Sequence, residues 1–159
     1  MSDALSFFER FARKAKNYGT PDPSETRVTH PFDERNIHPD IARVSQKLFD
    51  DGHYSHATFE AFKLIDNLVQ SLTGIPETGH KLMMNAFNEV SPKIQLNDLQ
   101  TLSDKDEQFG FRFVFAGSMS AIRNPRGHDN NRPDPIDLSL DHLSFASVLL
   151  RTLEGRKLP

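Results

Sequence analysis

Two arginines, an asparagine and a histidine lie close together in one short stretch of the sequence, SMSAIRNPRGHDNN at residues 118–131. Histidine titrates near neutral pH, so His128 could take a proton from a ribose 2′-hydroxyl or give one to a leaving 5′-oxygen. The guanidinium of Arg123 stays charged and can hold a phosphate through two parallel hydrogen bonds. These two residues supply the minimum chemistry for cutting RNA without a metal ion. Asn124 and Arg126 are candidate substrate-binding residues beside them.

The same residues also have a plainer interpretation. Cations complement the negative end of a helix dipole, so Arg123 and Arg126 could simply stabilise the end of a helix, with His128 as a solvated loop residue. The Arg-x4-His spacing is weak evidence alone, because chance supplies roughly 0.5 such pairs in a chain of this composition. Spacing therefore leaves both interpretations open.

The segment that must position Arg123 is residues 104–123, DKDEQFGFRFVFAGSMSAIR. Read with period two, its phenylalanines would face one side of a strand. Read with helical spacing, it has one apolar stripe that leads to Arg123, made of Phe109, Phe113, Ala116 and Ser120. We predict a helix, because Ser103 and Asp106 resemble a helix start and no partner strand is evident. Arg112 would then point nearly the same way as Arg123, which makes it a further candidate for substrate binding.

The end of this helix is predicted from its proline. Pro125 disfavours the helical conformation for Asn124, so we expect the helix to end near Arg123. Gly127 would then give the chain the freedom to turn His128 back toward the helix end.

Helical spacing predicts further helices on either side. One begins near Ile37, with Pro39 in its first turn, and closes at residues 50–52. The next ends at Gly74, and a third spans residues 81–90. A connector covers residues 91–103, and Asp137 is expected to cap a last helix that ends near residue 154. We therefore predict one all-α domain over residues 37–159, an up-down helical bundle with short connections.

Residues 1–36 are predicted to be an accessory N-terminal helix and linker. Residues 3–16, DALSFFERFARKAK, have a short apolar side and several cations, so they could lie on a membrane, on RNA, on the domain or on a second subunit. Residues 17–36 hold three prolines and little periodicity, which predicts a linker or an irregular wrap.

Composition limits the remaining possibilities. The chain has 159 residues, 36% of them hydrophobic, with 13 Phe and no Trp, which fits one domain with a Phe-rich core. It has no cysteine, which excludes disulfides and thiolate catalysis and fits a reducing, cytoplasmic compartment. No apolar run is long enough to cross a membrane. The net charge of −3 argues against a surface that binds polyanions everywhere, but leaves room for a local basic site.

Several separated pieces of the sequence resemble a known family in order. They are LFDDGHYSHATFEAFKLIDNLV, LMMNAF, the QFGFRFVFAGSMSAIRNPRGH run and the closing helix. RNPRGH is similar to the Arg-x4–6-His signature of HEPN domains. The wider resemblance, over about residues 37–154, is to the Ymh-type family of phage-like and mobile elements, a HEPN-related group.

That resemblance implies a HEPN-like bundle in which two chains pair so that both Arg-His sites meet in one cleft. It implies a metal-independent endoribonuclease that leaves 2′,3′-cyclic phosphate ends, acting in phage defence or a toxin–antitoxin system. Arg123 would bind the scissile phosphate, His128 would be the acid–base group, and Asn124 would be the polar residue that often follows the arginine. Glu60 would be the charged residue that an earlier helix points into the cleft, although it has the features of an ordinary boundary glutamate.

Other partners and functions are weighed against this one. Many HEPN proteins have lost activity, so a non-catalytic binding or antitoxin-like module is the competing hypothesis, and the acidic net charge favours it slightly. We expect no cofactor and no metal, because His53 and His56 have no third ligand at a suitable spacing. DNA binding finds little support, because no recognition-helix signature is present. We expect a homodimer, because residues 109–122 expose more apolar surface than one helix can cover, and close approach is permitted by Ala116, Gly117, Ser118 and Ser120.

Overall fold

A computed structural model of the chain describes residues 29–128 and 133–156. The chain divides into two compact units, Met1–His30 and Pro31–Pro159. The second unit is helical, and the described residues form no β-strand, which confirms the predicted all-α class. The expected helix at residues 3–16 and most of the linker at 17–36 lie outside the described residues. No described helix has the length and apolar content needed to cross a membrane.

The second unit begins with two helices joined at a buried aromatic contact. The short helix α2 (Pro31–Glu34) lies in the stretch that the sequence predicts to be irregular. It buries Phe32, whose ring lies 5.2 Å from that of Phe49 in helix α3 (Pro39–Asp50). The predicted proline in the first turn of α3 is present, and the last residues of the predicted linker belong to this unit.

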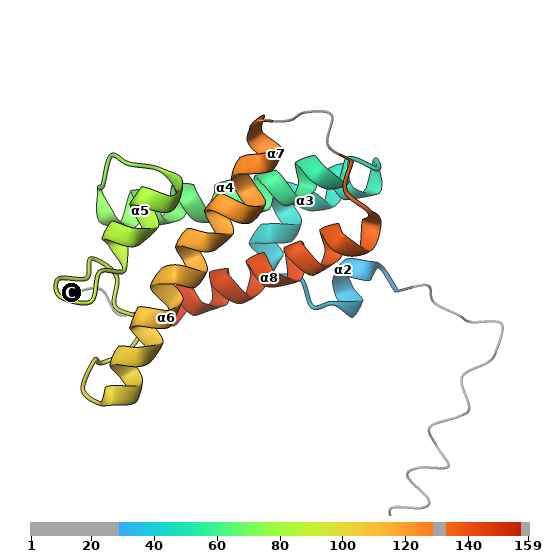
Figure 1. The fold of residues 1–159 in the computed structure, drawn as a ribbon. Coiled ribbons are helices and arrows are strands. Elements are labelled where there is room, and N and C mark those ends of the chain that lie inside the picture. The colour runs from blue at the N-terminus through green and yellow to red at the C-terminus, as the bar shows by residue number, and fades with distance from the viewer. Residues whose placement is uncertain (1–28, 129–132, 157–159) are drawn as a thin grey trace, which may run out of the picture. The chain divides into compact units, whose positions relative to one another are not determined.

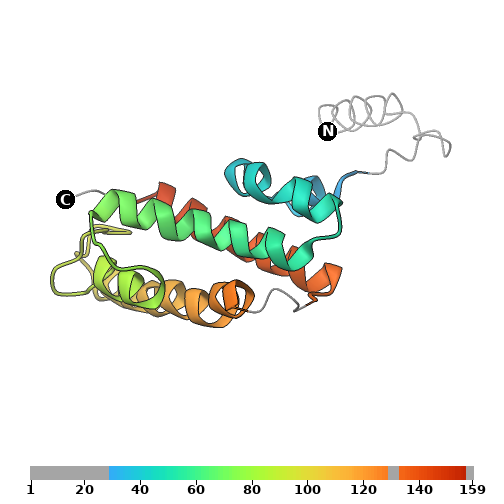
Figure 2. The same ribbon diagram turned by 90° about the horizontal axis from the view of Figure 1, so that it is seen from above.

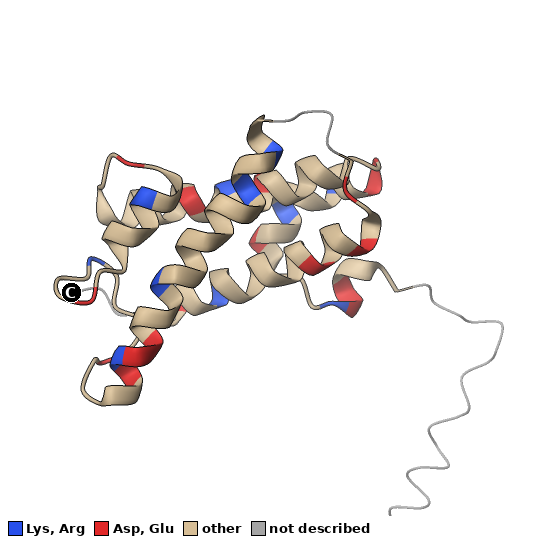
Figure 3. Cartoon of the chain, viewed as in Figure 1, with Lys and Arg blue, Asp and Glu red and all other residues tan. Residues whose placement is uncertain are grey.

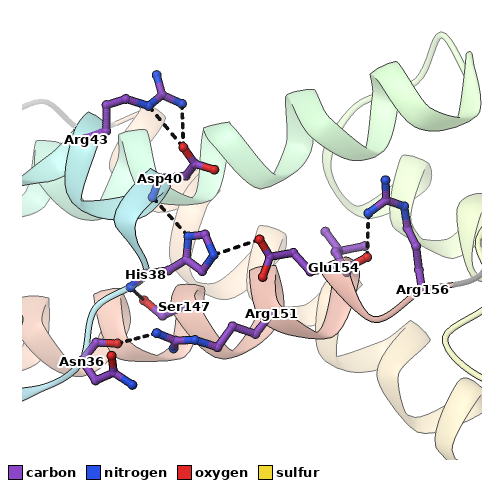
Figure 4. Close-up of polar contacts among 9 residues, drawn as sticks. Asn36, His38, Asp40, Arg43, Ser147, Arg151, Glu154 and Arg156 are labelled. Carbon is purple, nitrogen blue, oxygen red and sulfur yellow. Dashed lines mark hydrogen bonds and ion pairs between the residues drawn. The ribbon is translucent and has the colours of Figure 1, made fainter.

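His38 holds the start of α3 against the last helix of the chain, α8 (Ile136–Glu154), as Figure 4 shows. Its Nδ1 accepts a hydrogen bond from the backbone N–H of Asp40 and so caps α3. Its Nε2 lies 3.0 Å from a carboxylate oxygen of Glu154, and its own backbone N–H donates to the Ser147 hydroxyl. This buried histidine thus joins the start of α3 to α8, although His38 and Ser147 are 109 residues apart in sequence.

Helix α4 (Tyr54–Thr73) is the central element of the bundle. It packs against α3, α8 and the helices that surround the candidate site. Figures 1 and 2 show that the chain reverses direction between α3 and α4, and again between α4 and α6. The helix ends at Gly74 with a φ of 67°, as predicted, because a left-handed residue closes a helix and glycine adopts that conformation at little cost. Its inward face is fully buried and includes Ala61, Phe62, Ile65 and Val69.

Helix α5 (Gly79–Ala86) leads into an ordered connector and then helix α6 (Leu102–Ser118). The buried side chain of Gln108 holds the connector to α6, because its amide donates to the carbonyls of Phe87 and Ile94. Thr101 and Asp104 form a reciprocal capping box at the start of α6. The predicted start at Ser103 and Asp106 was therefore wrong by two residues.

Helix α6 contains many phenylalanines, but its sides differ in burial. One side is buried, where Phe115 stacks on Phe87 with ring centroids 4.5 Å apart. The other side is exposed: the side chains of Phe109, Phe113 and Val114 are 49%, 47% and 38% accessible. Figure 3 shows that acidic residues gather at the start of this helix.

The helical path continues past α6 without a break. A π-helical turn, η1 (Met119–Arg123), leads directly into helix α7 (Asn124–His128). Helix α8 then returns along α4, and its residues Leu143, Ala146, Leu149, Leu150 and Leu153 are all buried. Asp137 was expected to cap α8 but lies in its first turn, because the cap is Pro135 and the helix begins two residues earlier than predicted, at Ile136.

Candidate functional site

The π-helical turn η1 changes the predicted geometry of the candidate site. Asn124 has helical angles, φ −63° and ψ −44°, and its N–H donates to the carbonyl of Met119 five residues earlier. The predicted helix end at Arg123 was therefore wrong. A proline inside a helix clashes with the carbonyl four residues before it. The wider turn shifts the carbonyl register by one residue just before Pro125, which lets the helix continue to His128.

Arg123 is partly buried in a cluster formed by η1, α7 and α4. Its guanidinium lies over the ring of Phe59, with Cζ 5.5 Å from the ring centroid. Nη1 donates to Oδ1 of Asn124 at 3.1 Å, and Nη2 lies 3.7 Å from Oδ2 of Asp66. Nε is buried and has no hydrogen-bond partner among the described residues. Three neighbours thus restrain a guanidinium whose side chain is still 25% exposed.

Asp66 is a site residue that sequence reasoning missed. Its side chain is only 3% exposed, and its Oδ1 accepts a hydrogen bond from the backbone N–H of Gly79 at the start of α5. Gly79 has a φ of 62°, a conformation that favours glycine. The signal in the sequence was an aspartate within the apolar face of α4, next to Ile65. A buried carboxylate needs a compensating partner, and Arg123 and the Gly79 amide are those partners.

Phe59 is the second residue that the sequence did not single out. It is half-buried, and Lys63 Nζ lies 5.7 Å from its ring centroid, so two cations lie near one ring. A Cβ atom on residue 127 would lie 2.8 Å from Cε2 of Phe59. Gly127 was predicted to make a turn. It instead lies within α7 and lets the helix backbone pack against the ring.

His128 is the last residue of α7, and it is exposed. Within the described ranges, no hydrogen bond or ion pair joins its side chain to Arg123. The two residues lie on one short helical segment, so the backbone fixes their separation. The predicted turn that would fold His128 back does not form.

Arg126 has a structural position that the sequence did not predict. It is 3% exposed, and its Nε and Nη2 donate to the two carboxylate oxygens of Asp134 at 2.5 and 3.0 Å. Nη1 donates to the carbonyl of Ile122, and Nη2 lies 3.2 Å from Nδ1 of His142. His142 is half-buried in this network. These hydrogen bonds engage the Arg126 guanidinium and hold α7 to α8.

The remaining candidates lie away from Arg123 or pair locally. Arg112 donates to the carbonyl of Met84 and to Glu89, so it does not join Arg123 as the helical spacing predicted. Glu60 pairs with Lys63, one turn along the same helix, at 3.0 Å. Lys63 in turn lies over the ring of Phe59, so Glu60 is linked to that ring only through Lys63.

The described residues contain no group of three histidine, cysteine, aspartate or glutamate side chains that could hold a metal ion. The rings of His53 and His56 lie 6.1 Å apart near the start of α4. These two side chains alone make an incomplete ligand set.

A family model described as "Protein of unknown function (Hypoth_ymh)" matches residues 35–153. No curated protein and no solved structure matches the chain. The matched segment covers every helix from α3 to α7 and nearly all of α8.

Proposed function

This chain belongs to the Hypoth_ymh family, and from that premise we propose that it is a metal-independent endoribonuclease of the HEPN type. The observation that carries the proposal is the restrained guanidinium of Arg123, partly exposed on the same short segment as the exposed imidazole of His128. A guanidinium held by neighbours loses little freedom when it binds a phosphate, so it stabilises the transition state effectively.

The proposed reaction uses the RNA's own hydroxyl group. The 2′-oxygen attacks the adjacent phosphorus and loses its proton to a base, while the bond from phosphorus to the 5′-oxygen breaks and that oxygen gains a proton. The products are a 2′,3′-cyclic phosphate and a free 5′-hydroxyl, and DNA resists because it lacks the 2′-hydroxyl. Arg123 would hold the phosphate as negative charge grows, and His128 would move a proton.

We further propose that the enzyme is a homodimer with a HEPN-like bundle in each subunit. One imidazole cannot both accept the 2′-proton and protonate the 5′-oxygen on opposite sides of the phosphorus in one step. A second copy would bring a second His128 to the same cleft. The exposed apolar side of α6, with Phe109 and Phe113, is the surface that supports such pairing. A role in phage defence, or with a cognate antitoxin, fits an RNA-cutting enzyme that needs restraint.

Purified protein incubated with single-stranded RNA in EDTA should produce fragments with 2′,3′-cyclic phosphate ends. Arg123→Ala and His128→Ala should abolish this cleavage, while circular dichroism shows that both variants are folded. Arg43→Ala and His53→Ala alter exposed residues of the same types that come before α4 in the chain, and should cut like the parent. If the two site variants cleave RNA as fast as the parent, the assignment of Arg123 and His128 as catalytic residues is wrong.

A second candidate function is a non-catalytic binding module. The observation that favours it is the pairing of each cation near Phe59 with a carboxylate, Arg123 with Asp66 and Lys63 with Glu60. The four charges sum to zero, which weakens attraction for a polyanion. A stable protein partner that copurifies, with no nuclease activity after its removal, would favour this function over catalysis.

A further inference from the structure

We propose that Phe59 is a stacking surface for an unpaired nucleobase beside the phosphate held by Arg123, so that the site selects single-stranded RNA. The inference rests on the proposed ribonuclease function for the identity of the strand, and deepens it by naming the form of RNA bound. Aromatic rings flanked by cations are the usual means of holding single strands, because each base has a π face and each linkage has a charge.

The position of the ring carries this inference. Phe59 is half-buried on α4, next to the guanidinium that would hold a phosphate. Neighbouring bases and phosphates in a strand are separated by only a few bonds, so one nucleotide can reach both groups. Gly127 lets the backbone of α7 pack against one edge of the ring, since a Cβ atom there would lie 2.8 Å from Cε2 of Phe59. A base must therefore approach the ring through a face.

Lys63 now lies near the ring, and a bound base would displace it easily. Its ammonium is 5.7 Å from the ring centroid and 3.0 Å from Glu60, but the side chains of this pair are 42% and 36% exposed. Exposed ion pairs of this kind contribute little to stability. The ammonium can therefore move from the ring to a flanking phosphate, which frees the part of the ring that it covers. The guanidinium of Arg123 stays over the ring, 5.5 Å from its centroid.

A base that stacks on an isolated ring must be free of its own partners. In a duplex each base is already stacked and paired, and the A-form major groove is too narrow for a side chain to reach it. A ring on a rigid helix can accept only a base that is splayed from its strand. Phe59 should therefore discriminate by strandedness and tolerate every base identity.

Equilibrium binding tests this inference apart from catalysis. The full chain carrying His128→Ala is titrated into fluorescein-labelled octauridylate, into the same ribose-phosphate strand without bases, and into a duplex of equal length, with anisotropy as the readout. Adding Phe59→Leu keeps apolar bulk but removes the π face, and should weaken octauridylate binding by about 5- to 150-fold. Binding of the base-free strand should weaken less, because it loses only the contact between the ring and the phosphate-binding Arg123. Phe145→Leu, at a half-buried phenylalanine of α8, controls for general effects on packing.

Each outcome decides between the two proposals. Three results would overturn the stacking role. Octauridylate could bind equally well with and without the Phe59→Leu change, the base-free strand could lose as much affinity as octauridylate, or no strand could bind. Cleavage in EDTA by the parent, measured separately, tests the ribonuclease. If RNA binding depends on Phe59 but the parent does not cleave RNA, the stacking role is supported and the ribonuclease proposal is wrong. If the parent cleaves RNA but binding does not depend on Phe59, the ribonuclease proposal is supported and the stacking role is wrong.

Discussion

Arg126 and Asp134 form a buried, two-pronged ion pair that joins the helix carrying His128 to the residues leading into α8. Both side chains are at most 2% exposed. Arg126 lies between Arg123 and His128 in sequence and was expected to bind substrate, but its guanidinium is committed to Asp134, the Ile122 carbonyl and His142. Its contribution to the site is to hold α7 in place.

Removing one partner of this pair should destabilise the domain strongly. Asp134→Ala leaves a buried guanidinium without its carboxylate, and such losses cost about 3–5 kcal/mol. Urea unfolding followed by circular dichroism measures the change. Asp141→Ala removes the exposed pair with Arg35 and should cost at most about 1 kcal/mol.

A double variant separates charge from packing at the same place. Arg126→Met with Asp134→Leu removes both charges and keeps apolar volume, so it should be more stable than either single variant. If the double variant lost as much free energy of unfolding as the two single variants lose in sum, the two residues would not be acting as a coupled pair.

Asp66 should position Arg123 rather than bind RNA. Asp66→Asn keeps an oxygen for the Gly79 amide but removes the negative charge 3.7 Å from the guanidinium. A misplaced phosphate-binding group lowers the rate, so kcat for RNA cleavage should fall on the order of 10²-fold. Affinity for RNA, measured in the His128→Ala background, should hold or rise because one repelling charge is gone. Unchanged kcat, or a loss confined to KM, would contradict a positioning role.

Local patterns in the sequence were enough to predict most of the helices. The helix predicted to begin near Ile37 with Pro39 in its first turn, and the helix end predicted at Gly74, depend on residues close in the chain, and the structure agrees with both. The path after Arg123 was mispredicted for the opposite reason. Whether Pro125 ends a helix depends on the π turn before it and on the packing of Gly127 against Phe59, which lies 68 residues away in the sequence.

The charged groups of the site show the same limit. Arg123 and His128 were chosen as candidates because they are near each other in sequence. Asp66 and Asp134 were missed, because burial of a carboxylate is decided by the elements packed around it. An aspartate inside an apolar helix face is a usable signal, and applied to α4 it would have selected Asp66 rather than Glu60.

The start of α6 should respond to acid through Asp104. Hydrogen bonds from the backbone N–H groups of Thr101 and Gln100, and from the Thr101 hydroxyl, hold the pKa of Asp104 below its ordinary value. A lowered folded pKa means that the carboxylate stabilises the fold above its unfolded pKa of about 3.9 and loses that effect as the pH falls through the folded value. Asp104→Asn should therefore unfold at a lower temperature than the parent at pH 5–7, with the gap closing below about pH 4. Asp106→Asn, two residues later and outside the capping box, is the control, and a gap independent of pH would exclude the charge as its cause.

The exposed side of α6 should make the chain self-associate. Phe109, Phe113 and Val114 are all more than a third exposed, and Gly110 and Gly117 beside them are open to close approach by another helix. Ala116 and Ser118, which were expected to help, face the chain's own core. Phe113→Asp should weaken a dimer by about 30-fold or more, because a central aromatic contact contributes roughly 2 kcal/mol, and sedimentation equilibrium measures the change. Val148→Asp, at an equally exposed apolar residue of α8, should leave the dimer intact. A parent protein that sediments as a monomer at micromolar concentration would remove this interface.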